Sequence, residues 1–285
     1  MDVGAHVGTF AVQAAEAVGA GGRVIALEPT PKTFACLAAN ASGHAAFFAA
    51  GGPGGGGAAT ATKTSPSPAI TLSASAGGAG PALAPAPAPP PTLTPAPITA
   101  LNTAAGPPGR SSAVFTVYRA MAGLSTCVPV LDDAMEASLT EYVKRAPPRD
   151  WRHRLAAKAQ AVLPARAFDA GARAFARSVV RPRDEVTCAM APLSETLASP
   201  AVALDPKAEI GLLKIDVERY ELEVMAGITP ADWARVRQLV FECHDAGAGV
   251  AAAKAAGFKS VVVDDGGAEA AGVTGEATCN VYCRK

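Results

Sequence analysis

Short apolar runs alternate with helical stretches over the last third of this 285-residue chain. Strands are predicted at 211–217, 238–243, 259–263 and 280–283, and helices at 218–226, from 229 onward and at 249–256. The last two strands are predicted to pair antiparallel. This alternation predicts an α/β fold with a mostly parallel sheet and helices on both faces, in which ligands bind at the carboxyl ends of the strands.

The first fifty residues alternate in the same way. An acidic residue and a glycine turn precede a helix at 9–18, and a short buried strand follows at 23–27. Residues 45–49 fit a third strand, and residues 113–117 fit another.

Residues 50–112 differ in composition from the rest. They are mostly Gly, Ala, Pro, Ser and Thr, and Lys63 and Arg110 are their only charged side chains. Such a segment buries too little apolar surface to offset its chain entropy, so it is predicted to be a long disordered insertion. It is either a tolerated surface insertion or a docking segment for a proline-binding module. The predicted folded domain therefore consists of 1–49 and 113–285.

Residues 132–183 read as a basic helical excursion from this domain. Eleven Lys or Arg residues lie between 144 and 183, against Asp150 and Asp169. The helices either present a solvated face or bind an anionic partner, such as an acidic carrier protein or a membrane surface.

Composition narrows the setting. The formal net charge is zero, which gives no reason to expect nucleic acid, and no apolar run is long enough for a membrane span. The six cysteines have no zinc-ligand spacing, so no metal is expected and the thiols read as those of an intracellular protein. Because the chain starts inside a motif, targeting to an organelle cannot be assessed.

The segment Asp2 to Gly8 is typical of a turn that binds a nucleoside-bearing cofactor. Gly4 and Gly8 allow a tight turn and a close approach of the cofactor to the backbone. Glu28, followed by Pro29, ends the second strand, where it can accept hydrogen bonds from two ribose hydroxyls. The spacing lacks the third glycine of a dinucleotide turn. S-adenosylmethionine is therefore favoured over a nicotinamide dinucleotide, and a plain chain-reversing turn is the remaining alternative.

Further polar residues follow the strands at 211–217 and 238–243. His244 is the first candidate for a general base because its ordinary pKa lies near neutrality, and Asp216 is the second. Asp245 or Glu242 would orient the imidazole, and Glu218 would lie on the substrate side. The alternatives are a loop histidine for His244 and a helix cap for Asp216.

Taken together, these blocks resemble the FkbM-type family of S-adenosylmethionine-dependent methyltransferases. The matching stretches are 2–8, 24–29, 212–218, 221–224 with Gly227, 115–118 with 123–126, and Trp233 with 238–245. The last of them is similar to members linked to polyketide and peptide synthetases.

The resemblance implies a Rossmann-like class I methyltransferase sheet and methyl transfer to a hydroxyl of a small molecule, a glycan or a polyketide-like acceptor. It also implies cofactor contacts from Asp2, Gly4, His6, Gly8 and Glu28. Asp216 and Glu218 would lie near the transferred methyl group.

Three features depart from the family pattern. His6 replaces a frequent Asn, and Arg219 replaces a usual Gly, at a cost of about 1 kcal/mol or more if the backbone there has positive φ. Only Met1 precedes Asp2, so the first strand is predicted to be truncated and the cofactor turn loosened. The alternative function is therefore a truncated, non-catalytic, methyltransferase-like binding module.

Overall fold

The computed structural model describes residues 1–49, 94–119, 125–128, 132–145, 158, 160–181, 183–264 and 279–285. Their strands are β1 (Asp2–Val3), β2 (Val24–Leu27), β3 (Ile98–Leu101), β4 (Ala104–Ala105), β5 (Ser112–Tyr118), β6 (Arg183–Ala191), β7 (Ile210–Ile215), β8 (Val236–Cys243), β9 (Ser260–Asp264) and β10 (Cys279–Arg284). Their helices are α1 (Thr9–Val18), α2 (Pro31–Ala49), α3 (Asp132–Arg145), α5 (Ala165–Val180), α6 (Leu193–Ala198), α7 (Glu221–Ala226), α8 (Pro230–Arg235) and α9 (Ala246–Ala255).

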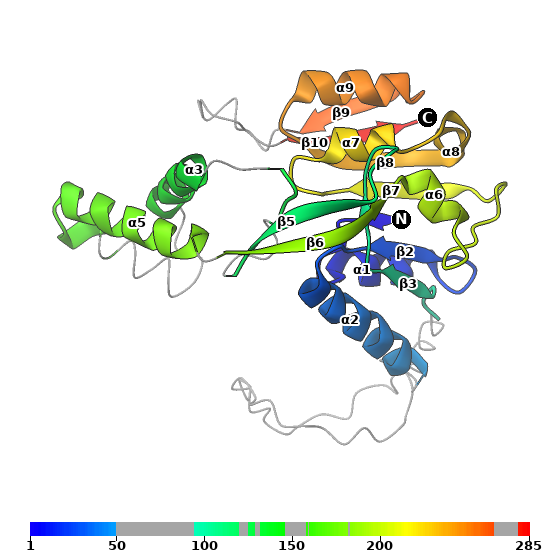
Figure 1. The fold of residues 1–285 in the computed structure, drawn as a ribbon, viewed down its shortest axis with the longest axis horizontal. Coiled ribbons are helices and arrows are strands. Elements are labelled where there is room, and N and C mark those ends of the chain that lie inside the picture. Colours follow the sequence, from blue (N-terminus) through cyan, green and yellow to red (C-terminus); the bar gives the residue numbers. More distant parts are fainter. Residues whose placement is uncertain are drawn as a thin grey trace, which may run out of the picture.

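The main sheet has the strand order β3-β2-β1-β7-β8-β10-β9 (Figure 1). Five neighbouring strands from β3 to β8 are parallel, and β10 runs antiparallel to both β8 and β9, as predicted for the last two strands. The order reverses between β1 and β7, and the carboxyl ends of strands at such a switch point are where open α/β sheets bind ligands. The fold is a mixed α/β sheet flanked by helices, compatible with a Rossmann-like fold.

Burial on both faces explains why β2 is apolar throughout. Ile25 and Leu27 belong to the large core cluster, whereas Val24 and Ala26 pack with Ala11 and Ala15 of α1 and other residues in a second cluster. A strand covered on both sides loses the polar alternation of a surface strand.

The first strand is short but central. Asp2 pairs with Ala26 of β2 and with Lys214 of β7, and Val3 pairs with the next residue on each side. This pairing on both sides places β1 inside the sheet, between β2 and β7. Because β1 spans two residues, only the last two residues of β2 and of β7 have a β1 partner.

The predicted insertion is wrong over its last part. Residues 94–112 contain β3 and β4, and β3 pairs in parallel with β2 over four residues. Ala104 and Ala105 are buried, because β4 pairs with β6 in a second sheet of order β4-β6-β5. Composition alone did not indicate that this segment is folded, because the strands with which it pairs are distant in sequence. Residues 50–93 lie outside the described residues.

Two other expectations need correction. Residues 45–49 belong to α2 and form no strand, because the helix beginning at Pro31 continues through them. The helical excursion ends before 183, where β6 begins. Within it, α3 ends at Arg145, before Pro147-Pro148, and residues 146–157 lie outside the described part. In Figure 1, α3 and α5 lie at one end of the β5–β6 ribbon, away from the main sheet.

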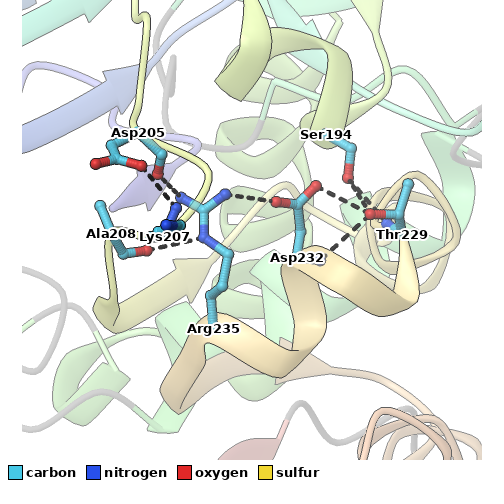
Figure 2. Close-up of polar contacts among 7 residues, drawn as sticks. All are labelled: Ser194, Asp205, Lys207, Ala208, Thr229, Asp232 and Arg235. Carbon is cyan, nitrogen blue, oxygen red and sulfur yellow. Dashed lines mark hydrogen bonds and ion pairs between the residues drawn. The ribbon is translucent and has the colours of Figure 1, made fainter.

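The predicted helix start at residue 229 is α8, and its contacts anchor the loop before β7 (Figure 2). Thr229 Oγ1 accepts a hydrogen bond from the Asp232 amide. Arg235 donates to Asp232 Oδ1 at 2.8 Å and to the carbonyl oxygens of Asp205 and Ala208 at 3.0 and 2.8 Å. One guanidinium thus joins α8 to the loop that leads into the central strand β7.

Two further features concern membrane spans and cysteines. Among the described residues, no helix has the length and apolar character that crossing a membrane requires. All six cysteines are free thiols.

Candidate functional site

A cleft opens at the carboxyl ends of β1, β2 and β7. It has about 560 Å³ of empty space including its open mouth. Six of the predicted site residues line it, namely Gly4, His6, Glu28, Pro29, Asp216 and Glu218. The strands therefore bring the first turn and the acidic block after β7 to one place.

The first turn is held by its backbone. Gly4 and Gly8 have φ of 83° and 90°, and the amides of Gly4 and Ala5 both donate to the Leu27 carbonyl. A Cβ at Gly4 would lie 1.8 Å from the carbonyl oxygen of Asp216, and one at Gly8 would lie 2.7 Å from Leu37 Cδ1. Packing against the backbone therefore requires glycine at Gly4, and the positive φ favours it at Gly8, in addition to the predicted approach of a ligand.

Glu28 connects this turn to the end of β2. Its Oε2 accepts from the His6 amide at 3.1 Å, and its Oε1 accepts from the amide and hydroxyl of Thr30. The side chain is buried beside the cleft. Carboxylate oxygens have two lone pairs each, so Oε2 retains the capacity to accept another hydrogen bond. Binding of ribose by Glu28 stays a prediction.

Asp2 lies beneath the cleft and is not among its lining residues. It is wholly buried, and neither carboxylate oxygen has a hydrogen-bond donor among the described residues. The ammonium of Lys214 lies 3.4 Å from Oδ1. Burial raises the pKa of Asp2, and Lys214 opposes that rise. Asp2 therefore faces Lys214 and does not line the cleft, and its contact with a cofactor stays a prediction.

Three carboxylates meet at the edge of the cleft. Oxygens of Asp216, Glu218 and Glu242 all lie within 4.8 Å of one another. Burial, followed by the charge of Asp216, raises the pKa of Glu218 to about 7 and also raises that of Glu242. Lys214 donates to Asp216 at 2.9 Å. The sequence placed these acids at one edge of the sheet, and the structure brings them into a single group.

The two residues after β8 do not join this group. His244 is half-buried and is not among the residues that line the cleft. Asp245 is exposed, and its carboxylate accepts from the Ala248 amide at 2.9 Å as the N-terminal cap of α9. Asp245 therefore serves as a helix cap, and the orientation of the imidazole by Asp245 or Glu242 stays a prediction.

The turn after Asp216 has an unusual backbone. Glu218 and Arg219 have φ of 55° and 78°, a region that residues with a Cβ rarely adopt. The Glu221 carboxylate accepts from the amides of Val217 and Arg219, and Thr126 donates to the Glu218 carbonyl at 2.6 Å. These contacts hold the strained turn and aim Glu218 at the cleft.

Replacing Arg219 with glycine should stabilise the protein by about 0.5–1 kcal/mol, because glycine adopts positive φ without the Cβ penalty. Urea denaturation measures the change. Arg219→Ala is the control: it removes the same charge but keeps a Cβ, so it should not stabilise. Equal stability of the two variants would show that charge, not backbone conformation, governs this position.

The raised pKa of Glu218 predicts a pH dependence. Its folded-state pKa of about 7 lies above the unfolded value of 4.5, so its contribution to stability is complete below the unfolded value and is lost as pH rises toward 7. The loss should be about 2 kcal/mol after allowance for partial exposure. Denaturation curves in chelator across this range should show it, and Glu218→Gln should flatten the slope. An unchanged slope in that variant would contradict the assignment.

Several cleft residues escaped the sequence analysis. Asn102 follows β3 and donates to the carbonyl oxygens of Glu28 and Pro29, and Thr103 lines the cleft beside it. Both fall within the segment predicted to be disordered, and the short apolar run before them was the available signal. Tyr220, held by Arg110 through a 2.7 Å hydrogen bond, also lines the cleft.

The basic helices partly neutralise their own charge. Glu136 of α3 lies 3.3 Å from Arg177 and 2.8 Å from Arg181 of α5, and Lys144 lies 3.1 Å from Asp169. Part of the positive charge of these helices is therefore paired with acidic side chains in contacts between the two helices. Binding of an anionic partner by residues 144–183 stays a prediction.

Comparison with known proteins gives a partial relationship. The chain is 41% identical over 86 residues to 31-O-demethyl-FK506 methyltransferase FkbM of Streptomyces tacrolimicus, covering 29% of this chain and 31% of that protein. It is 50% identical over 46 residues to AMB antimetabolite synthetase AmbE of Pseudomonas aeruginosa, covering 16% of this chain and 2% of that protein. No family model and no solved structure matches it. The chain is therefore related in part to a methyltransferase.

Proposed function

We propose that this protein is an S-adenosylmethionine-dependent methyltransferase that methylates a hydroxyl oxygen of a small molecule, a carbohydrate or a polyketide-like acceptor. The observation that carries the proposal is the partial identity to a methyltransferase in a chain whose glycine turn and Glu28 share a cleft at the switch point of the sheet.

The residues present fit this cofactor. The turn from Gly4 to Gly8 would hold it at the backbone, and Glu28 would accept a hydrogen bond from its ribose through the lone pair left on Oε2. The negative charge of Asp2, buried beneath the turn, would favour a ligand that carries an amine. When bound, S-adenosylmethionine supplies an electrophilic sulfonium methyl group.

Methyl transfer to a hydroxyl also requires loss of the hydroxyl proton. Asp216 lines the cleft and its side chain is 40% exposed, so it can reach an acceptor. His244 lies outside the lining. The geometry therefore favours Asp216 over His244 as the group that takes the proton, which reverses the order suggested by the sequence.

Isothermal titration with S-adenosylhomocysteine tests the cofactor assignment. We expect saturable heat with one site per chain. Absence of heat at millimolar ligand, in protein shown to be folded by circular dichroism, would exclude a cofactor site of useful affinity.

A non-catalytic binding module is the second candidate, favoured by the two-residue β1 and by Arg219 in its strained conformation. Such a module would bind the cofactor in the same site but would not transfer the methyl group. Incubation with methyl-labelled S-adenosylmethionine and a panel of hydroxylated acceptors separates the two: label transfer that Asp216→Asn abolishes supports the enzyme, and binding without any transfer supports the module.

A further inference from the structure

We propose that Asp216, Glu218 and Glu242 form a binding site for a hard divalent cation at the edge of the cleft. Their oxygens lie within 4.8 Å of one another. Two ligands on one ion are separated by at most twice the ion–oxygen distance, which is about 4.2 Å for Mg²⁺ and about 5 Å for Ca²⁺. Oxygens at this separation are close to the spacing that Ca²⁺ requires, and a small closure of the three side chains would bring them onto Ca²⁺ or, with a further closure, onto Mg²⁺.

The surroundings of Asp2 support the site independently. It does not belong to the three, yet it is wholly buried, and both its oxygens lack a hydrogen-bond donor among the described residues. Its Oδ1 faces the Lys214 ammonium at 3.4 Å, and the same ammonium lies 2.9 Å from Asp216 Oδ2. One lysine is thus shared between a buried carboxylate without other partners and the acidic group beside it.

These contacts leave the three carboxylates with too little positive charge nearby. Glu221 adds a further buried carboxylate next to the group, although backbone amides satisfy it. Among the described residues, Arg219 also acts on the group, since its positive charge lowers the pKa of Glu218. Several carboxylates so close together repel one another. A divalent cation would remove that repulsion and would leave Lys214 to Asp2.

The chemistry of the ligands selects the ion. Three carboxylates, with no thiol or imidazole among them, suit Ca²⁺, Mg²⁺ or Mn²⁺ better than Zn²⁺ or Cu²⁺. Asp216 and Glu218 also line the cleft, so the ion would face its interior. If the proposed function holds, an oxygen of the acceptor could bind the ion there. Cation binding itself does not depend on that function.

Titration of the full-length, chelator-treated protein with CaCl₂, MnCl₂ or MgCl₂ tests the site. We expect one ion per chain with a dissociation constant below about 1 mM, and a matching rise in melting temperature. Glu242→Gln should weaken binding at least tenfold. Without metal, this variant should melt no lower than the unsubstituted protein, because the substitution relieves repulsion. Glu223→Gln, which changes an exposed acid on α7, should bind as the unsubstituted protein does.

Two results would overturn the proposal. One is no heat and no thermal shift with any of the three ions at about 10 mM. The other is unchanged binding in both Glu242→Gln and Asp216→Asn, which would place the ion elsewhere. The ion titration contains no S-adenosylhomocysteine. Absence of ion binding would therefore leave the cofactor assignment untouched, and the separate titration with S-adenosylhomocysteine tests that assignment.

Discussion

Replacing Gly4 with alanine should destabilise the protein by more than about 4 kcal/mol, enough to leave it largely insoluble or unfolded. The new Cβ would lie 1.8 Å from the carbonyl oxygen of Asp216, and neither atom can move freely. That oxygen belongs to the backbone at the end of β7, and Gly4 itself is held to β2 by its amide. The positive φ of Gly4 adds about 1–2 kcal/mol for any residue with a Cβ.

Gly43→Ala is the matched control for this substitution. Gly43 lies within α2, and a Cβ there would meet no atom within 4 Å. Alanine is the better helix former, so this variant should be as stable as the unsubstituted protein or more so, by up to about 1 kcal/mol. Thermal unfolding followed by circular dichroism compares the two. If Gly4→Ala melted within about 2 °C of the unsubstituted protein, the close approach of the turn to β7 would be wrong.

The second large effect is expected for Glu28→Ala, which should weaken S-adenosylhomocysteine binding about 10- to 100-fold. Three of the four carboxylate lone pairs already accept from His6 and Thr30, so the loss is one charge-assisted hydrogen bond to ribose, worth about 1.5–3 kcal/mol. The substitution also removes the acceptor for the His6 and Thr30 amides, so the turn would lose one of its attachments to β2. The dissociation constant is measured by isothermal titration, well below the melting temperature of the variant.

Two variants distinguish ligand contact from a loosened turn. Glu28→Gln keeps one acceptor oxygen, so it should retain most of the fold while still losing affinity. Glu16→Ala removes an exposed carboxylate that contacts His44 and should leave the dissociation constant unchanged. An unchanged constant in Glu28→Ala would remove Glu28 from the ribose site, and the carboxylate would then serve only to hold the turn.

Local pattern was sufficient where neighbours in sequence determine the conformation. Thr229 with Pro230 indicated the start of α8, and the apolar run at 238–243 indicated most of β8. The conformation of Arg219 could also be anticipated, because a turn that usually has glycine commonly requires positive φ. These features depend on hydrogen bonds that span a few residues.

The sequence by itself therefore determined the α/β alternation, the glycine turn and the placing of acids after the strands. Tertiary structure decided the rest. It paired β3 with β2, buried Asp2 beside Lys214 and made Asp245 the cap of α9. It also brought Glu242 against Asp216. Each of these outcomes depends on strand order, register or burial, which arise from contacts between distant segments and leave little trace in any short stretch of sequence.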